Sequence, residues 1–312
     1  MAAQQLVILG GTGFVGSHLV PRLAADGHRI VLLSRNREQH RELGVLPQVT
    51  IRSADVYNDD VLRREFEGAD AVINLVGILN TQGRHTFQRA HVELTRRVIA
   101  ACHASSVNRL HQMSSLKAGQ GLSQYLKTRG EAETLVKASG LDWTIYQPSV
   151  IFGEGDGLVS RFAALLRRMP VLPLARAKSR MAPTFVGDVA EAIARCVNSD
   201  KLGLRRCFEL YGPDVFTLGE IVHQIRNAAG LHTPIIPLHD SLGRLQSQVA
   251  GLLPGKPFSL DNFQSLRTDS IGKTDGYAAL GIVSQPFTPW LPRLIGGSPL
   301  QRRLDEARAA WG

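Results

Sequence analysis

The sequence predicts an α/β protein with a doubly wound parallel sheet and a smaller C-terminal α/β lobe. Short runs of leucine and β-branched residues alternate with segments of helical periodicity over the first 150 residues, as in strand–helix–strand crossovers. A glycine-rich turn joins the first strand to the first helix. After residue 147, frequent prolines divide the chain into short pieces, which favours a separate, irregular lobe.

The strands of the sheet are expected at residues 6–9, 29–34, 49–51, 71–75, 109–113 and 143–146. Each is a short, mostly apolar run, which is typical of a parallel sheet covered on both faces. Helices are expected at 14–25, 87–104 and 125–139. In the first of them Leu19, Val20 and Leu23 form one apolar face.

The domain organisation follows from the same change of pattern. Residues 1–150 are predicted to form a Rossmann-type dinucleotide-binding domain, and residues 151–312 a mixed substrate lobe. A strand and helix at about 181–200 are expected to return to the first domain.

Composition excludes several classes of protein. The chain has 312 residues, 44% hydrophobic and 20% charged, so it can bury a core without disulfide or metal staples. Its three cysteines form no CxxC and no metal-ligand spacing, so we expect no metal and a reducing, cytoplasmic location. The first strand leaves no room for a signal peptide. The longest apolar run, residues 71–79, is too short to cross a bilayer.

The glycine-rich turn carries the functional prediction. Gly10, Gly13 and Gly16 are spaced for a tight turn, close approach to a pyrophosphate and close packing of helix on strand. A pyrophosphate would lie at the helix N-terminus, beside Thr12 and Phe14, where free N–H groups favour an anion. The alternative is a glycine-rich turn that binds nothing.

The end of the second strand bears on cofactor choice. NAD sites have an acid there for the ribose 2′-hydroxyl, whereas this strand ends in Ser34-Arg35-Asn-Arg37. Arg35 is suited to a 2′-phosphate, so NADP(H) is preferred and NAD(H) is the alternative. The competing interpretation is that Arg35 and Arg37 are solvated charges in a loop.

Several segments together resemble the extended, atypical branch of the short-chain dehydrogenase/reductase superfamily. They are the glycine motif, Ser53-Ala-Asp55, Asn74-Leu-Val76-Gly77, Met113-Ser-Ser115, Tyr125, Tyr146-Gln-Pro148 and Phe185-Val-Gly-Asp188. The resemblance implies that Asp55 contacts the adenine amino group and that Val76, Gly77 and Pro148 line the cofactor. It also implies that Tyr125 and Ser115 are catalytic.

Within this superfamily, four segments resemble the NADPH-holding accessory subunit of respiratory complex I and its bacterial relatives. They are Tyr125-Leu-Lys-Thr-Arg-Gly-Glu-Ala-Glu133, Leu141-Asp-Trp-Thr-Ile145, Pro183-Thr-Phe-Val-Gly-Asp-Val-Ala190 and Leu260-Asp-Asn-Phe263. This resemblance implies an NADPH-binding protein linked to quinone or respiratory metabolism.

The catalytic motif departs from the family pattern. Arg129 replaces the lysine four residues after Tyr125, on the same helix face, so we assign it a supporting role in catalysis. His91 stands where many relatives have asparagine, and Gln147 where they often have arginine. The leading interpretation is an NADPH-dependent oxidoreductase. The alternatives are a non-catalytic NADPH-binding structural or redox-sensing protein and a nucleotide-sugar epimerase or dehydratase.

The net charge of +9 bears on partners. An acid-free, arginine-rich stretch lies at 157–187. The family resemblance implies that it approaches the substrate side, which favours a small anionic or hydrophobic substrate. A second acid-free stretch, 276–304, places Trp290, Leu291 and Ile295 beside arginines, including Arg302 and Arg303. That pattern indicates a peripheral membrane or respiratory-complex contact, with a solvated basic face as the alternative. Aromatics are only 6%, so a nucleic-acid partner is disfavoured.

Overall fold

The computed structural model describes residues 3–35, 43–199, 201–252 and 258–296. Its centre is a seven-stranded sheet in the order β11-β6-β5-β4-β1-β2-β3, with every neighbouring pair parallel. The strands are β1 (Gln5–Leu9), β2 (Arg29–Ser34), β3 (Val49–Ser53), β4 (Ala71–Asn74), β5 (Arg109–Met113), β6 (Asp142–Pro148) and β11 (Arg206–Leu210). The predicted doubly wound α/β class is confirmed.

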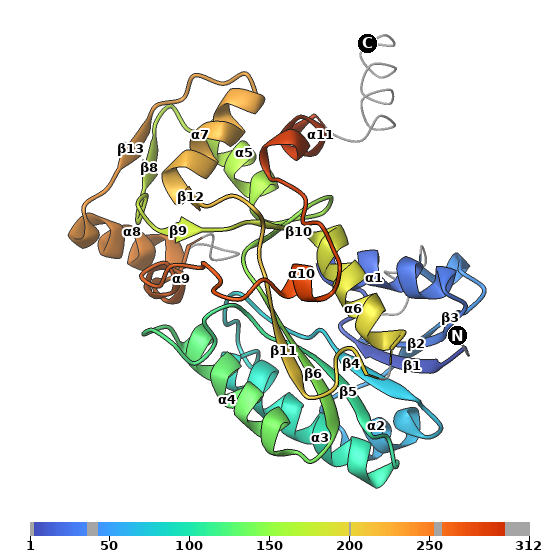
Figure 1. Cartoon of the computed structure of the whole chain (residues 1–312). Coiled ribbons are helices and arrows are strands. Elements are labelled where there is room, and N and C mark those ends of the chain that lie inside the picture. Colours follow the sequence, from blue (N-terminus) through green and yellow to red (C-terminus); the bar gives the residue numbers. More distant parts are fainter. Residues whose placement is uncertain (1–2, 36–42, 200, 253–257, 297–312) are drawn as a thin grey trace, which may run out of the picture.

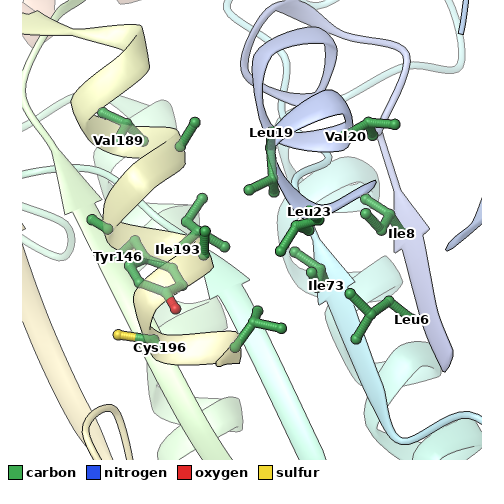
Figure 2. Close-up of a cluster of buried hydrophobic side chains, with 14 of the residues drawn as sticks. Leu6, Ile8, Leu19, Val20, Leu23, Ile73, Tyr146, Val189, Ile193 and Cys196 are labelled. Atoms are coloured by element: carbon green, nitrogen blue, oxygen red, sulfur yellow. The ribbon is translucent and has the colours of Figure 1, made fainter. Parts of the chain in front are cut away.

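Helices cover both faces of this sheet (Figure 1). They are α1 (Phe14–Ala25) and α6 (Val186–Val197) on one face, and α2 (Asp59–Phe66), α3 (Leu94–Ala104) and α4 (Gln124–Ala138) on the other. Because strand side chains alternate between faces, Leu6 and Ile8 of β1 pack under α1 while Val7 and Leu9 pack on the opposite side. Figure 2 shows the α1 and α6 side, where Ile193 shares the core with these side chains.

The long helix expected at 87–104 is interrupted. Residues Gln88–Glu93 form one π-helical turn before α3 begins at Leu94. The π turn moves His91 into the interior, 1% exposed, and the apolar periodicity of the segment contains no signal for it.

The C-terminal lobe is built from short elements around a core of its own. Its strand pairs are β7 (Ile151–Phe152) with β10 (Thr184–Phe185), β8 (Leu172–Leu174) with β13 (Ile235–Pro237), and β9 (Arg180–Met181) with β12 (Phe216–Thr217). Its helices are α5 (Val159–Arg168), α7 (Leu218–Ala228), α8 (Asp240–Leu252), α9 (Leu260–Ser265) and α11 (Leu291–Ile295). A 3-10 turn at Thr288–Trp290 also belongs to the lobe, and another, at Leu43–Val45, lies before β3 in the first half of the chain.

Three segments from the second half of the chain return to the sheet. Helix α6 packs against α1, β11 pairs with β6 at the sheet edge, and α10 (Gly276–Ala279) packs on β11. Strand β11 was not expected, because two of its five residues are charged and it follows a loop. None of the helices in the described ranges is long and apolar enough to cross a membrane.

The expected anchors near residue 290 face the lobe instead of a bilayer. Trp290 stacks on Phe185 with ring centroids 4.0 Å apart, and Leu291 is 1% exposed. Arg293 pairs with Glu154 at 2.7 Å. The prediction of a membrane contact by residues 290–295 is therefore wrong, because this segment completes the lobe's own core. Arg302 and Arg303 lie outside the described residues.

Candidate functional site

An elongated cavity of about 1060 Å³ follows the carboxyl ends of the central strands and continues into the lobe. Open α/β sheets bind their ligands at this edge. The predicted site residues on its wall are Gly10, Thr12, Gly13, Phe14, Gly16, Arg35, Val76, Gly77, Ser115, Tyr125, Arg129 and Pro148. The fold therefore brings together residues that are up to 138 positions apart (148 − 10).

The glycine turn leaves no space for side chains. A Cβ at Gly16 would lie 2.3 Å from the carbonyl oxygen of Gly11, and Gly10 has a φ of +75°. The Gly13 N–H donates to Gly10 O at 3.0 Å and closes the turn. Among the described residues, no side chain caps the N-terminus of α1 and its first turn holds no acid. This backbone cradle fits a pyrophosphate, which would accept from the exposed N–H groups.

Asp55 lies off the cavity wall. In the turn between β3 and α2, Val56 and Tyr57 line the cavity, whereas Asp55 does not. Its carboxylate accepts a hydrogen bond from the Tyr57 N–H at 3.0 Å and so shapes this turn. Its predicted contact with adenine stays a prediction. The sequence analysis missed Tyr57, whose ring carries the Arg89 guanidinium 4.2 Å from its centroid and whose pKa is raised by burial.

The end of β2 presents a cationic group to the cavity. Arg35 Nη1 donates to His85 Nε2 at 3.1 Å, and both side chains lie on the wall. His85 comes from a tight turn that bridges Gln82 and His85, after β4. No sequence motif marks this histidine. Arg37 lies outside the described residues.

The two serines after β5 have different partners. The Ser114 hydroxyl donates to buried Glu133 at 2.6 Å. The Ser115 hydroxyl is buried and has no hydrogen-bond partner among the described residues. Since an unpaired buried hydroxyl is costly, Ser115 is the serine whose oxygen is available to a bound ligand.

Tyr125 lies at the start of α4 and faces the same cavity. Its half-buried ring meets the edges of two neighbours, with centroids 5.5 Å from His91 and 6.0 Å from Phe87. These contacts hold the ring from the π-helical side and leave its cavity side open.

Arg129 is almost fully buried one turn along α4. Its guanidinium carbon lies 5.6 Å from the Tyr125 ring centroid. Its Nη1 donates to the backbone oxygens of Met113, at 2.9 Å, and Val76, at 3.4 Å. A Cβ at Gly77 would lie 2.1 Å from Nη2, so the guanidinium occupies the space beside Gly77. Arg129 thus ties the ends of β4 and β5 together beside Tyr125.

His91 is held in one neutral form. The Thr128 hydroxyl donates to Gln124 O at 2.8 Å, so it accepts the proton of His91 Nδ1 at 2.9 Å. His91 Nε2 then accepts from the Ile78 N–H at 3.5 Å. Burial, helped by the charge of Arg129, lowers the pKa of His91 to about 2. This side chain is a fixed hydrogen-bonding support rather than a source of protons.

A family model described as NAD(P)H-binding matches residues 10–200. The chain belongs to this NAD(P)H-binding family. It is 26% identical over 280 residues to the mitochondrial NADH dehydrogenase [ubiquinone] 1 alpha subcomplex subunit 9 of Arabidopsis thaliana, covering 85% of this chain and 70% of the relative. It is 30% identical over 239 residues to ceramide reductase of Caulobacter vibrioides, covering 75% of this chain and 74% of the relative.

Among solved structures, an NADPH-dependent quinone oxidoreductase of Escherichia coli, complexed with NADPH, aligns with a TM-score of 0.74 at 20% identity. The alignment covers 92% of this chain and 98% of the other. The resemblance to short-chain dehydrogenases/reductases and to the complex I subunit is confirmed, and so is the prediction of a nicotinamide dinucleotide ligand.

In this NAD(P)H-binding protein the lobe also contacts the helix that carries Tyr125. Asp261 of α9 accepts from the backbone N–H groups of Gln124, at 2.7 Å, and Tyr125, at 3.2 Å. Asn262 donates to Leu79 O at 3.1 Å. The sequence analysis singled out residues 260–263 as a resemblance but gave them no role. The sequence shows the acid Asp261 in this segment, but only the tertiary structure shows that the segment lies against the start of α4.

Proposed function

We propose that the chain is an NADPH-dependent oxidoreductase that reduces a carbonyl group to an alcohol. The observation that carries the proposal is the buried, unpaired hydroxyl of Ser115, on the same cavity wall as Tyr125. Ser115 would donate a hydrogen bond to the substrate carbonyl oxygen. Tyr125 would give its phenolic proton to that oxygen as general acid. The names of the ceramide reductase relative and of the structurally similar quinone oxidoreductase support a reduction.

The cofactor would lie along the glycine end of the cavity. Gly10, Gly13 and Gly16 would hold its pyrophosphate, and Val76, Gly77 and Pro148 would border the nicotinamide half. When bound, NADPH would supply a hydride for the carbonyl carbon and would leave as NADP⁺. Tyr125 would supply the proton for the carbonyl oxygen, so that C=O becomes CH–OH. Arg129 holds its positive charge near the Tyr125 ring, close to where negative charge would develop as the proton leaves.

We assign the preference for NADP(H) over NAD(H) to Arg35. Its guanidinium lies on the cavity wall beside His85, so a 2′-phosphate there would meet a planar donor pair.

A second candidate is an NADPH-holding protein without turnover. It is favoured by Arg129, whose Nη1 is bound to two backbone carbonyls instead of being directed at a substrate or ribose. The Arabidopsis relative is named as a subunit of a respiratory dehydrogenase, which supports an assembly partner of that kind.

The test is to release and identify any nucleotide retained by the purified protein, then to follow NADPH oxidation with a set of ketones and quinones. Tyr125→Phe is expected to lower turnover by about 100-fold to 10,000-fold while the NADPH dissociation constant is unchanged. Lys127→Met is the matched control. Lys127 is exposed on the same helix and does not line this cavity, so the variant should retain full activity. Retained NADPH with no oxidation of any substrate would favour the non-catalytic candidate. Full activity of Tyr125→Phe would remove the catalytic assignment.

A further inference from the structure

The end of the cavity inside the lobe is lined mostly by apolar side chains, with Arg161 and Arg180 also on its wall. One side of α5 and its flanks supplies Leu158, Phe162, Leu165 and Met169, at helical spacing, and β8 adds Leu172 and Leu174. Nicotinamide, ribose and phosphate groups are polar, and burying them against such a wall without hydrogen bonds is costly. The wall is therefore suited to hydrocarbon. We call this part of the cavity the lobe chamber.

Helix α8 closes one side of the lobe chamber. Gln246 and Ala250 line the cavity, and Gln246 Nε2 donates to Pro173 O at 2.8 Å. A Cβ at Gly243 would lie 2.9 Å from the Cβ of Ala175, so the absence of a side chain lets α8 approach this closely. Helix α8 therefore packs closely against the lobe and forms one wall of the chamber.

The same helix exposes an apolar stripe. Leu242, Leu245 and Val249 are 53%, 55% and 57% exposed, and nothing in the described part of the chain covers them. At about 100° per residue they share one strip of the helix surface, directly beside Gln246 and Ala250. The polar residues Ser241, Arg244 and Gln248 lie on the remaining side.

We propose that the substrate is a long-chain amphiphile that enters the lobe chamber from a lipid bilayer, on which the α8 stripe rests. This rests on the proposed function, because the carbonyl group would be held at Ser115 and Tyr125 while the chain fills the chamber. Transfer along α8 would keep the hydrocarbon out of water from bilayer to chamber.

The occupant of the stripe is argued from its size, place and charge. Three side chains offer far less surface than the roughly 800 Å² per partner of a stable protein interface. Figure 1 shows α8 at the outer edge of the lobe, away from the central sheet, where a flat bilayer can reach it. Exposed Arg244 lies on the same helix, and the acid of this helix, Asp240, is paired with Arg176 at 2.7 Å. The chain also carries +9 overall, so anionic headgroups are favoured.

The chamber is tested by chain length. Calorimetric titration of the NADPH-loaded protein with alkan-2-ones of 5 to 11 carbons should show affinity rising by up to about fourfold per methylene. Leu165→Asn should flatten the series without changing the NADPH dissociation constant. Flat affinity in the wild type with normal NADPH binding would overturn the inference and leave the proposed function standing. Failure to bind NADPH would overturn both.

The stripe is tested by flotation with vesicles of phosphatidylcholine and phosphatidylglycerol (3:1) at low salt. The wild type should float. The vesicle-bound fraction of the double variant Leu245→Asp, Val249→Asp should be at least about fivefold lower than that of the wild type, because charges on the membrane-facing side of an interfacial helix are disfavoured. Gln248→Asp, which adds the same charge on the polar side, is the control and should float. NADPH affinity should be equal in all three proteins.

Three results would overturn the bilayer contact. The first is flotation of the double variant at the wild-type level, and the second is no flotation of the wild type. The third is a wild-type dimer by sedimentation that the double variant converts to a monomer, with no vesicle binding by either, since a second copy would then cover α8.

Discussion

The two ends of the cavity are built from different materials. At the glycine end the wall is mostly backbone, supplied by the four-residue turn between β1 and α1 (residues 10–13) and the first residues of α1. At the lobe end the wall is side chains from α5, β8, α8 and α9, segments that are separated by up to about a hundred residues. The first end fits a group common to all dinucleotides, and the second is the end that we propose to hold the substrate.

This difference indicates which part of the molecule determines specificity for the cofactor and which part determines specificity for the substrate. A backbone cradle tolerates almost no change, because a single Cβ collides with fixed carbonyl groups. A chamber walled by side chains can be resized by ordinary substitutions at a modest cost in stability. We therefore expect effects on the cofactor to be large and local, and effects on the substrate to be graded.

Gly16→Ala should have the largest effect on the cofactor end. The new Cβ would collide with Gly11 O, and relieving that contact should cost about 1–3 kcal/mol, or roughly tenfold to 100-fold in NADPH affinity by fluorescence titration. Gly27→Ala is the matched control, because its Cβ would meet nothing within 4 Å although its φ is +86°. It should lose some stability and no NADPH affinity. Equal losses in both variants would contradict a contact-based cradle.

His91 lies between the two ends and should give the protein a dependence on pH. In the folded state its pKa is lowered to about 2, so below about pH 6.5 the unfolded chain takes up a proton that the folded chain refuses. Stability from this group is complete above pH 6.5 and falls as the pH drops. Between pH 6.5 and 5 the loss should approach 2 kcal/mol.

Urea unfolding of the wild type and of His91→Gln over pH 5–7.5 measures this slope. The variant should be less stable at neutral pH and should lose less on acidification. Buried His111, whose pKa is also lowered by burial, contributes equally to both proteins and cancels in the difference. Parallel pH curves would show that His91 becomes protonated in the fold.

Arg35→Ala tests a side chain at the backbone-dominated end. NADPH affinity should fall about tenfold, the value of one charge-assisted contact on an exposed group, while NADH affinity is unchanged. Arg63→Ala, an exposed arginine on α2 paired with Asp60, is the control. If NADPH and NADH weaken together, Arg35 acts on a part shared by both cofactors.

Asp261→Asn should give the smallest effect and reports on the link between the two ends. Removing the charge at the α4 N-terminus should lower the free energy of unfolding by about 1 kcal/mol and reduce kcat more than KM, since Tyr125 is the residue displaced. Asp261→Glu should restore part of kcat. A variant that unfolds more easily but keeps its kcat would show that Asp261 stabilises the helix without positioning Tyr125.

Much of the fold could be predicted because its signals are local. The six expected strands lie where the apolar runs place them, and the helix after the glycine turn begins at Phe14 as predicted. Strand β11 was missed because its pairing with β6 is a long-range contact at the sheet edge. The residues near Trp290 were misassigned because apolar side chains between arginines are equally typical of a membrane contact and of a helix packed on its own lobe.

The sequence by itself indicated the βαβ order and the glycine cradle, and a family resemblance, not spacing, pointed to Ser115, Tyr125 and Arg129 as site residues. The order and the cradle depend on neighbours within a few residues, so spacing alone indicates them. Only the tertiary structure decided which serine is unpaired, that Arg129 binds the ends of β4 and β5, that Asp261 reaches α4, and that α8 covers an apolar chamber. Those properties arise from side chains brought together across the fold, where burial and available partners, not spacing, set the energy of each group.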